Sequence, residues 1–267
     1  MEQSKMERPS AHSQPLLRAE ELNKVYTTRL GGQKSEALHS VSFAVEQGEF
    51  VAVMGASGSG KTTLLNLIAS LDRPTAGAVF LEGKSLSKIP DKEMAAFRRK
   101  NLGFVFQDFN LLDNFTLKDN ILLPLVLSGE RPAAMKEKLK PLAESLGIGG
   151  LLEKYPYEVS GGEKQRAAVA RAVITEPRLL LADEPTGALD SKASQNLLRI
   201  FAGLNRAGQT ILMVTHSALA ASYASRVLFI RDGGLYDQLY REGRPRQEFF
   251  ELVMEHLALL ESTPEVG

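Results

Sequence analysis

The chain has 267 residues and is 43% hydrophobic, which corresponds to one large or two small domains with a sizeable core. Lysine plus arginine and aspartate plus glutamate each number 32, so the net charge is zero and no nucleic-acid partner is expected. The sequence contains no cysteine, which excludes disulfides, thiol catalysis and thiolate metal sites and fits a reducing cytoplasm.

The sequence also carries no evident targeting or membrane segment. Residues 1–15 are polar and lack an apolar core, so we expect a disordered N-terminus rather than a signal peptide. The longest strongly apolar stretches, such as residues 121–127, are far shorter than the roughly 20 residues that a membrane span needs. Any role at a membrane is therefore expected to come through a partner.

Two strands are predicted near the N-terminus. Alternating residues indicate a strand around residues 22–26, and a second strand is expected over residues 37–45 after a polar stretch. Tyr26 lies about thirty residues before a glycine-rich loop, where an aromatic ring is able to stack on a nucleotide base. An ordinary strand tyrosine explains the position equally well, and the pattern leaves both interpretations open.

The glycine-rich loop follows a buried strand predicted at residues 50–54. Residues 55–62 read GASGSGKT and fit G-x-x-x-x-G-K-[ST] at every fixed position. Glycines let backbone N–H groups turn toward phosphate oxygens, and the following helix adds partial positive charge at its N-terminus. Lys61 supplies a full charge for the β- and γ-phosphates, and the Thr62 hydroxyl is a suitable Mg²⁺ ligand.

A helix is predicted directly after the loop, and its apolar face is expected to comprise Leu64, Leu67, Ile68 and Leu71. A chance glycine-rich turn would lack the strand before it and the helix after it. The chain is therefore predicted to bind a nucleoside triphosphate.

Three further apolar strands are predicted to end directly before polar residues. Strand 102–106 precedes Gln107, strand 178–182 precedes Asp183 and Glu184, and strand 210–214 ends shortly before His216. Ligands of open α/β sheets bind outside the carboxyl ends of the strands, so these side chains are placed to meet one site. Asp183 is suited to hold Mg²⁺, and Glu184 to orient and polarise the attacking water. An ordinary loop residue remains the alternative for Gln107 and for His216.

The segment from residue 108 to residue 158 has a different, helical character. Helices are predicted over residues 118–128, interrupted by Pro124, and over residues 132–146, which indicates a helical insertion within an α/β domain. An apolar cluster precedes them and consists of Phe109, Leu111, Leu112 and Phe115. The cluster belongs either to the core or to a docking groove, and we expect part of it to be exposed for a partner.

A second glycine-containing motif, VSGGEKQR, covers residues 159–166 and leads into a helix. Ser160 is predicted to be its N-cap, and Glu163 has the spacing of a capping box. Gly161 and Gly162 in the first turn are costly unless a ligand approaches closely. A well-capped helix without a ligand is the alternative.

The remaining elements complete an alternating α/β pattern. They are a strand at residues 78–81, helices at 91–99 and 191–205, and hairpin strands at 226–230 and 235–240. A final amphipathic helix is predicted over residues 247–260, with Phe249, Leu252, Val253, Leu257 and Leu260 on one face. The tail after Ser262 is expected to be disordered.

Across residues 17–260 the sequence resembles the ATP-binding subunits of ABC transporters. GASGSGKT matches the Walker A loop, VSGGEKQR the signature motif and RLLLADEP the Walker B strand. Gln107 matches the Q-loop, Asp190 the D-loop and His216 the switch histidine, while Tyr26 falls at the base-stacking aromatic. One departure is Glu163, because the family usually has glutamine at this position of the signature.

This resemblance implies a fold class and a domain organisation. The fold would be the α/β P-loop NTPase fold of ABC ATPases, with a RecA-like core, an antiparallel β subdomain and a helical insertion. The ATP-binding domain is expected over residues 16–242, with the helical subdomain at about 108–165. Residues 243–267 would form the C-terminal helix and tail.

The resemblance further implies an ATPase that uses ATP and Mg²⁺ and works as a head-to-tail homodimer. Two ATP molecules would lie between the subunits. Glu184 would polarise water, His216 would contact the γ-phosphate, and Gln107 would link the metal to the helical subdomain. The implied ATP-binding residues are Tyr26, Gly55, Ala56, Ser57, Gly58, Ser59, Gly60, Lys61, Thr62 and Thr63. The implied metal ligands are Thr62, Gln107 and Asp183, and the implied contacts from the second subunit are Ser160, Gly161, Gly162, Glu163 and the D-loop residue Asp190.

Within the family, several stretches resemble the group that works with MacB-, Lol- or FtsX-like permeases. These are residues 104–127 and 181–195, and the C-terminal portion looks most like the Bce-type antimicrobial-peptide resistance transporters. The implied partners are an FtsX-like permease, a second copy of the chain and, as a further candidate, a membrane histidine kinase. The implied location is the cytoplasmic face of the plasma membrane, reached through the permease. A lipoprotein-releasing, MacB-like or FtsE-like ATPase is the alternative.

Other P-loop classes fit less well. A chromosome or DNA-repair ABC ATPase would carry a long coiled coil between the phosphate loop and the signature, where only about a hundred residues lie here. A ribosome-acting ABC protein would carry two cassettes, and a P-loop kinase would lack the signature. The transported substrate is not encoded in this chain, since specificity would lie in the permease.

Overall fold

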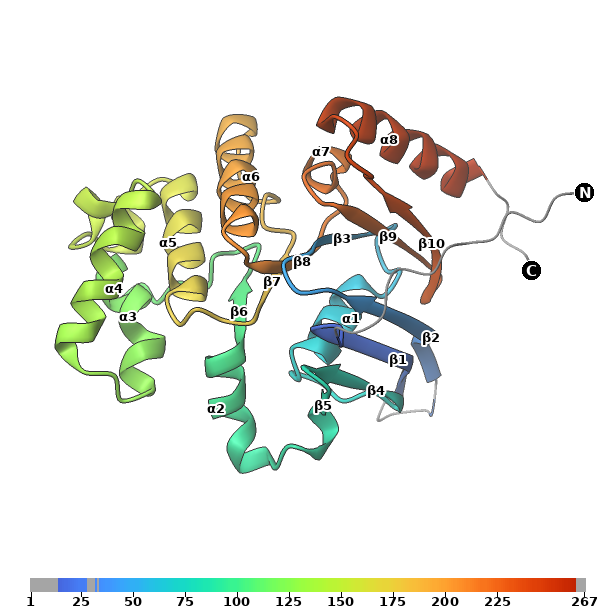
Figure 1. Ribbon diagram of the computed structural model, residues 1–267, viewed down its shortest axis with the longest axis horizontal. Coiled ribbons are helices and arrows are strands. Elements are labelled where there is room, and N and C mark those ends of the chain that lie inside the picture. Colours follow the sequence, from blue (N-terminus) through green and yellow to red (C-terminus); the bar gives the residue numbers. More distant parts are fainter. Residues whose placement is uncertain (1–13, 28–31, 33, 263–267) are drawn as a thin grey trace, which may run out of the picture.

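The computed structural model describes residues 14–27, 32 and 34–262 and contains two β-sheets with helices on both sides (Figure 1). The larger sheet has the strand order β10-β9-β3-β8-β7-β6. Its strands are β3 (Phe50–Met54), β6 (Leu102–Val105), β7 (Leu179–Asp183), β8 (Thr210–Val214), β9 (Arg226–Arg231) and β10 (Gly234–Tyr240). The smaller antiparallel sheet has the order β2-β1-β4-β5. Its strands are β1 (Leu17–Thr27), β2 (Lys34–Val45), β4 (Ala76–Leu81) and β5 (Lys84–Ser85).

Five neighbouring strands of the larger sheet run parallel, and only β10 pairs antiparallel, with β9. Every residue of β3 and of β8 is buried. Such unbroken apolar runs are typical of parallel strands that are covered on both faces. Because the strands run parallel, the loops after β3, β6, β7 and β8 all leave from the same edge of the sheet.

Helices cover both faces of the larger sheet. Helix α1 (Lys61–Ile68) packs in the hydrophobic cluster between the two sheets, together with residues of β1 and β2. Phe50, Phe201, Phe229 and Phe249 belong to the second cluster, on the other face. The helices that contribute to this cluster are α3 (Leu117–Leu127), α4 (Pro132–Ser145), α5 (Gly161–Val173), α6 (Ser191–Arg206), α7 (Ala218–Ala221) and α8 (Arg246–Ser262). Helix α2 (Asp91–Asn101) leads into β6.

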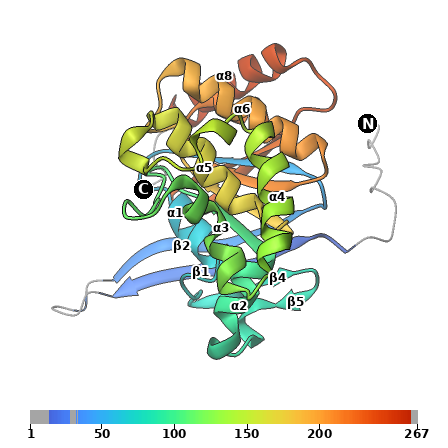
Figure 2. The same ribbon diagram turned by 90° about the vertical axis from the view of Figure 1, so that its left-hand side faces the viewer.

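The predicted helical insertion is present as α3 and α4, which stand together at one side of the molecule (Figures 1 and 2). Asn120, which is fully buried, shapes the loop in front of α3: its Nδ2 donates to the backbone oxygens of Leu112, Phe115 and Thr116. Its Oδ1 accepts from the N–H of Leu112 at 2.7 Å. The proposed end of the helical subdomain near residue 165 falls inside α5, which continues to Val173.

The structure corrects one detail of the predicted core. Leu71 was expected on the buried face of the first helix, but α1 ends at Ile68 and Leu71 is 52% exposed. Ser70 has a φ of 53°, so the backbone leaves the helix in the left-handed region and turns Leu71 away from the core. Leu64, Leu67 and Ile68 are buried as expected.

The C-terminal helix is confirmed and is two residues longer than predicted at its end. Phe249 and Val253 of α8 are fully buried, and Leu252, Leu257 and Leu260 are partly buried. Disorder was predicted for residues 1–15 and for the tail after Ser262; residues 1–13 and 263–267 lie outside the described residues, while residues 14 and 15 are described and belong to no helix or strand. Within the described part of the chain, no helix is long and apolar enough to cross a membrane.

Candidate active site

The phosphate loop lies between β3 and α1 at the carboxyl edge of the larger sheet. Gly58 and Gly60 have φ values of 80° and 99°, a region that favours glycine. A Cβ atom at Gly60 would lie 2.4 Å from the carbonyl oxygen of Ala37, so this position also needs the close approach that only glycine permits. No side chain caps the N-terminus of α1, so its first N–H groups remain available for phosphate.

A cavity of about 330 Å³ brings part of the predicted site together at the carboxyl edge of the sheet, although Asp183 is not among its lining residues. It is lined by Ala37, Ser57, Gly58, Gly60, Lys61, Thr62, Thr63, Glu184 and His216. Ala37 was not anticipated, because nothing in the sequence indicated that β2 passes the phosphate loop. The cavity therefore combines phosphate-binding backbone, a lysine and a hydroxyl with a carboxylate and an imidazole.

Lys61 is folded over the loop, where its Nζ donates to the carbonyl oxygens of Gly55 at 2.9 Å and Ala56 at 2.7 Å. Burial lowers the pKa of the Lys61 ammonium, while the nearby carboxylates of Glu184 and Asp183 act in the opposite direction. An ammonium held in this way can exchange two carbonyl partners for phosphate oxygens.

Asp183 and Glu184 lie side by side at the end of β7. Burial raises the pKa of Asp183, the negative charge of Glu184 adds to the rise, and Lys61 opposes it. Two adjacent acids with only one lysine nearby would be stabilised by a further cation. Thr62 and Asp183 offer the oxygen ligands that Mg²⁺ prefers. Among the described residues, no group of three or more acidic or histidine side chains is arranged so that it could hold a metal ion by itself.

Glu184 is fixed by His216. His216 Nδ1 donates to Glu184 Oε2 at 2.9 Å, and the backbone N–H of His216 approaches the same oxygen at 3.3 Å. Glu184 also has a φ of 44°, a strained conformation for a side-chain-bearing residue that is often found at functional sites. The Glu184 N–H donates to the carbonyl oxygen of Val214, so β8 holds this conformation.

Gln107 does not line this cavity. A Cβ atom at Gly187 would lie 3.0 Å from Gln107 Cδ, so the glutamine side chain packs against the loop that follows Glu184. Gln165 makes a second connection to this loop that the sequence analysis missed. It is fully buried, and its Nε2 donates to the backbone oxygens of Pro185 at 2.7 Å and Phe106 at 3.2 Å. The available signal was a polar residue on the otherwise apolar face of α5.

Tyr26 lies at the edge of the site, near Thr63. It is 42% exposed, its hydroxyl donates to Asp72 Oδ2 at 2.8 Å, and Lys24 Nζ lies 4.8 Å from the ring centroid. Burial and the hydrogen bond to Asp72 raise the pKa of Tyr26. The ring is therefore held in one orientation beside the phosphate loop.

The signature residues lie outside the cavity of their own chain. Ser160 caps α5, and the predicted capping box is confirmed: Glu163 Oε2 accepts from the Ser160 N–H and from its hydroxyl, both at 2.8 Å. These hydrogen bonds lower the pKa of Glu163. Asp190 caps α6, with its Oδ1 accepting from the Ala193 N–H at 2.8 Å, and is likewise absent from the cavity lining.

Comparison with known families identifies the family to which the chain belongs. The model of the ABC transporter family matches residues 38–187, more than half of the chain. The chain belongs to the ABC transporter family. It is an ATP-hydrolysing subunit of the transporter type, with the P-loop fold of ABC ATPases and with ATP and Mg²⁺ as its substrate and cofactor.

Individual relatives are similar over nearly the whole chain. The ABC transporter ATP-binding protein YxdL of Bacillus subtilis is 51% identical, over 92% of this chain and 94% of its own. The bacitracin export ATP-binding protein BceA of Halalkalibacterium halodurans is 50% identical, over 92% of this chain and 96% of its own. A dimeric structure of the cassette MJ0796 in a post-hydrolysis state bound to ADP and Pi superposes with a TM-score of 0.77 at 33% identity, covering 84% of this chain and 98% of that one.

We predict that Glu184→Gln abolishes steady-state ATP hydrolysis, with a loss of about a hundredfold or more. The change removes the charge that polarises water but keeps an acceptor for His216, so ATP affinity should be retained. Turnover and nucleotide binding of the purified chain measure the two effects. The matched control is Glu130→Gln, which changes an exposed carboxylate between α3 and α4. Near-normal turnover of the Glu184 variant would contradict the assignment.

We predict that Glu163→Gln changes ATPase activity less than about tenfold. A glutamine still accepts from the Ser160 N–H, and in the native chain the carboxylate is already folded back onto Ser160. Steady-state hydrolysis across a range of protein concentrations measures the effect. A larger rise would mean that the negative charge restrains dimer closure.

Proposed function

We propose that the chain works as a head-to-tail homodimer that drives an FtsX-like permease, in resistance to antimicrobial peptides. The main support for a dimer is that the predicted ATP site is split between two places in the chain. The phosphate loop, Glu184 and His216 share one cavity, while Ser160 lies outside it. A second subunit would bring its own signature to the open side of that cavity. The dimeric form of the similar cassette supports this arrangement.

The packing of Gly161, one of the two signature glycines, gives further support. A Cβ atom at Gly161 would meet only ordinary contacts, 3.7 Å from Leu189 and from Phe109, and Gly161 is not among the glycines with positive φ. Internal packing therefore does not require glycine here. Glycine in the first turn of a helix costs stability, and close approach of a group from outside the chain would explain its presence. We propose that this group is the γ-phosphate bound by the second subunit.

In the proposed reaction, Lys61 and the N-terminus of α1 hold the β- and γ-phosphates. Mg²⁺ bound with Thr62 and Asp183 would neutralise charge on the transferred phosphoryl group. Glu184 uses Oε2 to pair with His216, which leaves Oε1 to accept a hydrogen bond from the attacking water. His216 is 72% exposed in its side chain and so is accessible to a γ-phosphate without rearrangement of the sheet.

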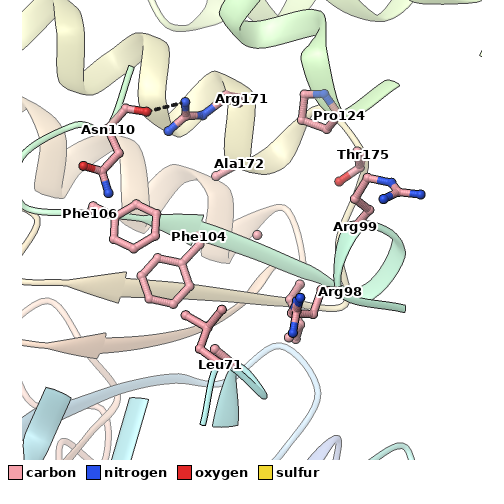
Figure 3. A pocket seen from close by; sticks show the side chains of 13 residues that line it. Leu71, Arg98, Arg99, Phe104, Phe106, Asn110, Pro124, Arg171, Ala172 and Thr175 are labelled. Atoms are coloured by element: carbon pink, nitrogen blue, oxygen red, sulfur yellow. Dashed lines mark hydrogen bonds between the residues drawn. The ribbon is translucent and has the colours of Figure 1, made fainter. Parts of the chain in front are cut away.

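A groove beside α3 is the proposed contact with the permease (Figure 3). It has a volume of about 400 Å³ and lies between the end of α2, β6, α3 and α5. Phe104 and Phe106 stack at 4.1 Å on one side, and Arg171 donates to the Asn110 carbonyl oxygen on the other, as Figure 3 shows. The exposed Leu71 also lines the groove. An apolar floor with Arg98, Arg99 and Arg171 at its margins suits a short amphipathic helix that carries acidic residues.

Of the apolar cluster at residues 109–115, some residues are exposed, as a docking surface requires, and others are partly buried, as expected for the core. Leu112 and Phe115 are 45% and 40% exposed. Phe109 and Leu111 are partly buried, and Leu111 packs against the core. We propose that the permease contact includes Leu112 and Phe115, which follow the groove residue Asn110 in the chain.

Gln107 and Gln165 supply a mechanical connection between the groove and the catalytic carboxylate. Gln107 follows the groove residue Phe106 and packs against Gly187, whose N–H donates to the carbonyl oxygen of Glu184 at 2.9 Å. Gln165 ties Phe106 to Pro185 through its side-chain amide. A change at the γ-phosphate would thus be transmitted to the permease contact through two short paths.

The proposed substrate class rests on the relatives. BceA is named for bacitracin export, and it is 50% identical to this chain. Lipoprotein release is the second candidate, since the lipoprotein-releasing ATP-binding protein LolD of Aquifex aeolicus is 43% identical over 85% of this chain. The Bce resemblance also makes a membrane histidine kinase a candidate partner. The proposed location is the cytoplasmic face of the plasma membrane, with the permease as anchor.

We predict that Leu71→Glu and Phe115→Glu reduce co-purification of the membrane permease by about tenfold, as expected for loss of a central apolar contact. ATP binding should remain intact, because neither residue lines the ATP cavity. Tyr236→Glu, at an exposed aromatic on β10, is the control. Affinity purification from native membranes with identification of the bound membrane protein measures the effect.

Two results would contradict this placement. Loss of cooperative unfolding in either variant would mean that the residue belongs to the core. Normal assembly together with normal peptide resistance would mean that the permease binds elsewhere on the chain.

A further inference from the structure

The C-terminal helix α8 is fixed onto the hairpin of β9 and β10, over which it lies in Figure 1. Phe249 and Val253 are fully buried in the core cluster that contains Phe229. His256 stacks on Phe229 with ring centroids 5.1 Å apart, and its Nε2 lies 2.6 Å from Asp237 Oδ2. The last turns of α8 are therefore held in a defined position before any partner binds.

These last turns reach the phosphate loop. A second cavity, of about 420 Å³, has Leu257 and Leu260 of α8 on one wall and residues 54–59 of the phosphate loop on the other. Ile230, Arg231, Asp232 and His216 complete the lining. We call this cavity the α8 groove. Arg231 Nε pairs with Asp232 at 3.3 Å, and the Arg231 guanidinium also donates to the carbonyl oxygen of Leu260 at 3.3 Å. The rest of the lining is backbone, apolar side chains, serine hydroxyls and the His216 ring.

The α8 groove adjoins the ATP cavity, because Ser57, Gly58 and His216 line both. A second subunit that covers the ATP cavity with its signature must therefore also come close to the α8 groove. The groove is in this way continuous with the proposed dimer interface.

The segment that accompanies the signature is the loop at residues 187–190. The Gly161 position lies 3.7 Å from Leu189 Cδ2, and the Gly162 position lies 3.1 Å from Ala193 Cβ, both measured from an added Cβ atom. The signature end of α5 is therefore packed against Leu189 of the loop and Ala193 at the start of α6. We call the signature end of α5 together with this loop one packed unit. Gly187, Ala188 and Asp190 are exposed in the single chain, so this unit has small and uncharged surface to offer beside its aspartate.

We propose that the α8 groove receives residues 187–190 of a second copy of this chain, so that Leu257 and Leu260 are part of the ATP-dependent dimer interface. This inference rests on the proposed head-to-tail dimer and assigns a role to α8 within it. Burial of the two leucines against Ala188 would add apolar area to the dimer interface. Since α8 is already held in place, little conformational entropy is lost when the partner docks.

The absence of native cysteine allows a direct test. Two single-cysteine chains, Leu260→Cys and Ala188→Cys, both in the Glu184→Gln background, are mixed with ATP and treated with a short bis-maleimide crosslinker. We expect a crosslinked dimer with ATP and none without nucleotide. Each single-cysteine chain is also treated by itself, which measures crosslinking between the same position in two copies. Met254→Cys replaces Leu260→Cys in the matched control, because Met254 lies on α8, is 48% exposed and does not line the groove.

A second measurement uses charge. Leu260→Glu should weaken ATP-dependent dimerisation by at least about tenfold, as expected for a carboxylate placed in an apolar contact. Met254→Glu should change it less than about twofold, because exposed substitutions outside an interface have small effects. Nucleotide binding by the monomer and the thermal unfolding midpoint are followed in both variants. Leu257→Asn provides a milder change on the same wall should Leu260→Glu fail to fold.

The outcomes separate the two proposals. If Glu184→Gln dimerises with ATP but Leu260 and Met254 behave alike in both measurements, the role of α8 is refuted while the dimer stands. If no ATP-dependent dimer forms at all, the proposed head-to-tail dimer fails, and the role of α8 fails with it.

Discussion

The parallel direction of β3, β6, β7 and β8 is the constraint on which the rest of the structure depends. It brings the chain back to the same edge four times, although the loops concerned are separated by up to about 160 residues. Each return places a different chemical group there: phosphate-binding amides and Lys61, then Gln107, then Asp183 and Glu184, then His216. The groups that the resemblance assigns to the reaction thus follow directly after strands that are largely buried.

In the proposed head-to-tail dimer, this edge forms only part of each ATP site. Lys61 offsets only part of the negative charge of Asp183, Glu184 and bound phosphates. His216, which lines the cavity, is 72% exposed in its side chain. The signature helix carries its own cap through Ser160 and Glu163, and it can therefore be stable without ligand. A monomer with a preformed half-site and a preformed signature is a sensible starting point for an ATP-dependent cycle, because neither part needs the other in order to fold.

Local sequence patterns predicted much of this arrangement. The strands before Gly55 and Asp183 and the capping box at Ser160 depend on neighbours in the chain, so periodicity and spacing were sufficient. Leu71 was misplaced because a single left-handed residue, Ser70, ends α1 one turn early. Gln165, the groove beside α3 and the approach of α8 to the phosphate loop depend on contacts between distant segments, for which the sequence pattern offers no direct signal. Resemblance to a family supplied the roles, whereas the packing of Gln107 on Gly187 is a contact between segments that are distant in the sequence.

The central claim is that each ATP site is completed by the second subunit, and a mixing experiment tests it most directly. Lys61→Ala disables the phosphate loop, and Gly161→Asp places a carboxylate at the signature, where the chain has room for a Cβ atom. Neither variant alone should hydrolyse ATP. A mixture should recover activity, up to about a quarter of the native rate if the two sites act independently, because mixed dimers contain one intact site. An inactive mixture, in which mixed dimers are shown to form, would contradict the account.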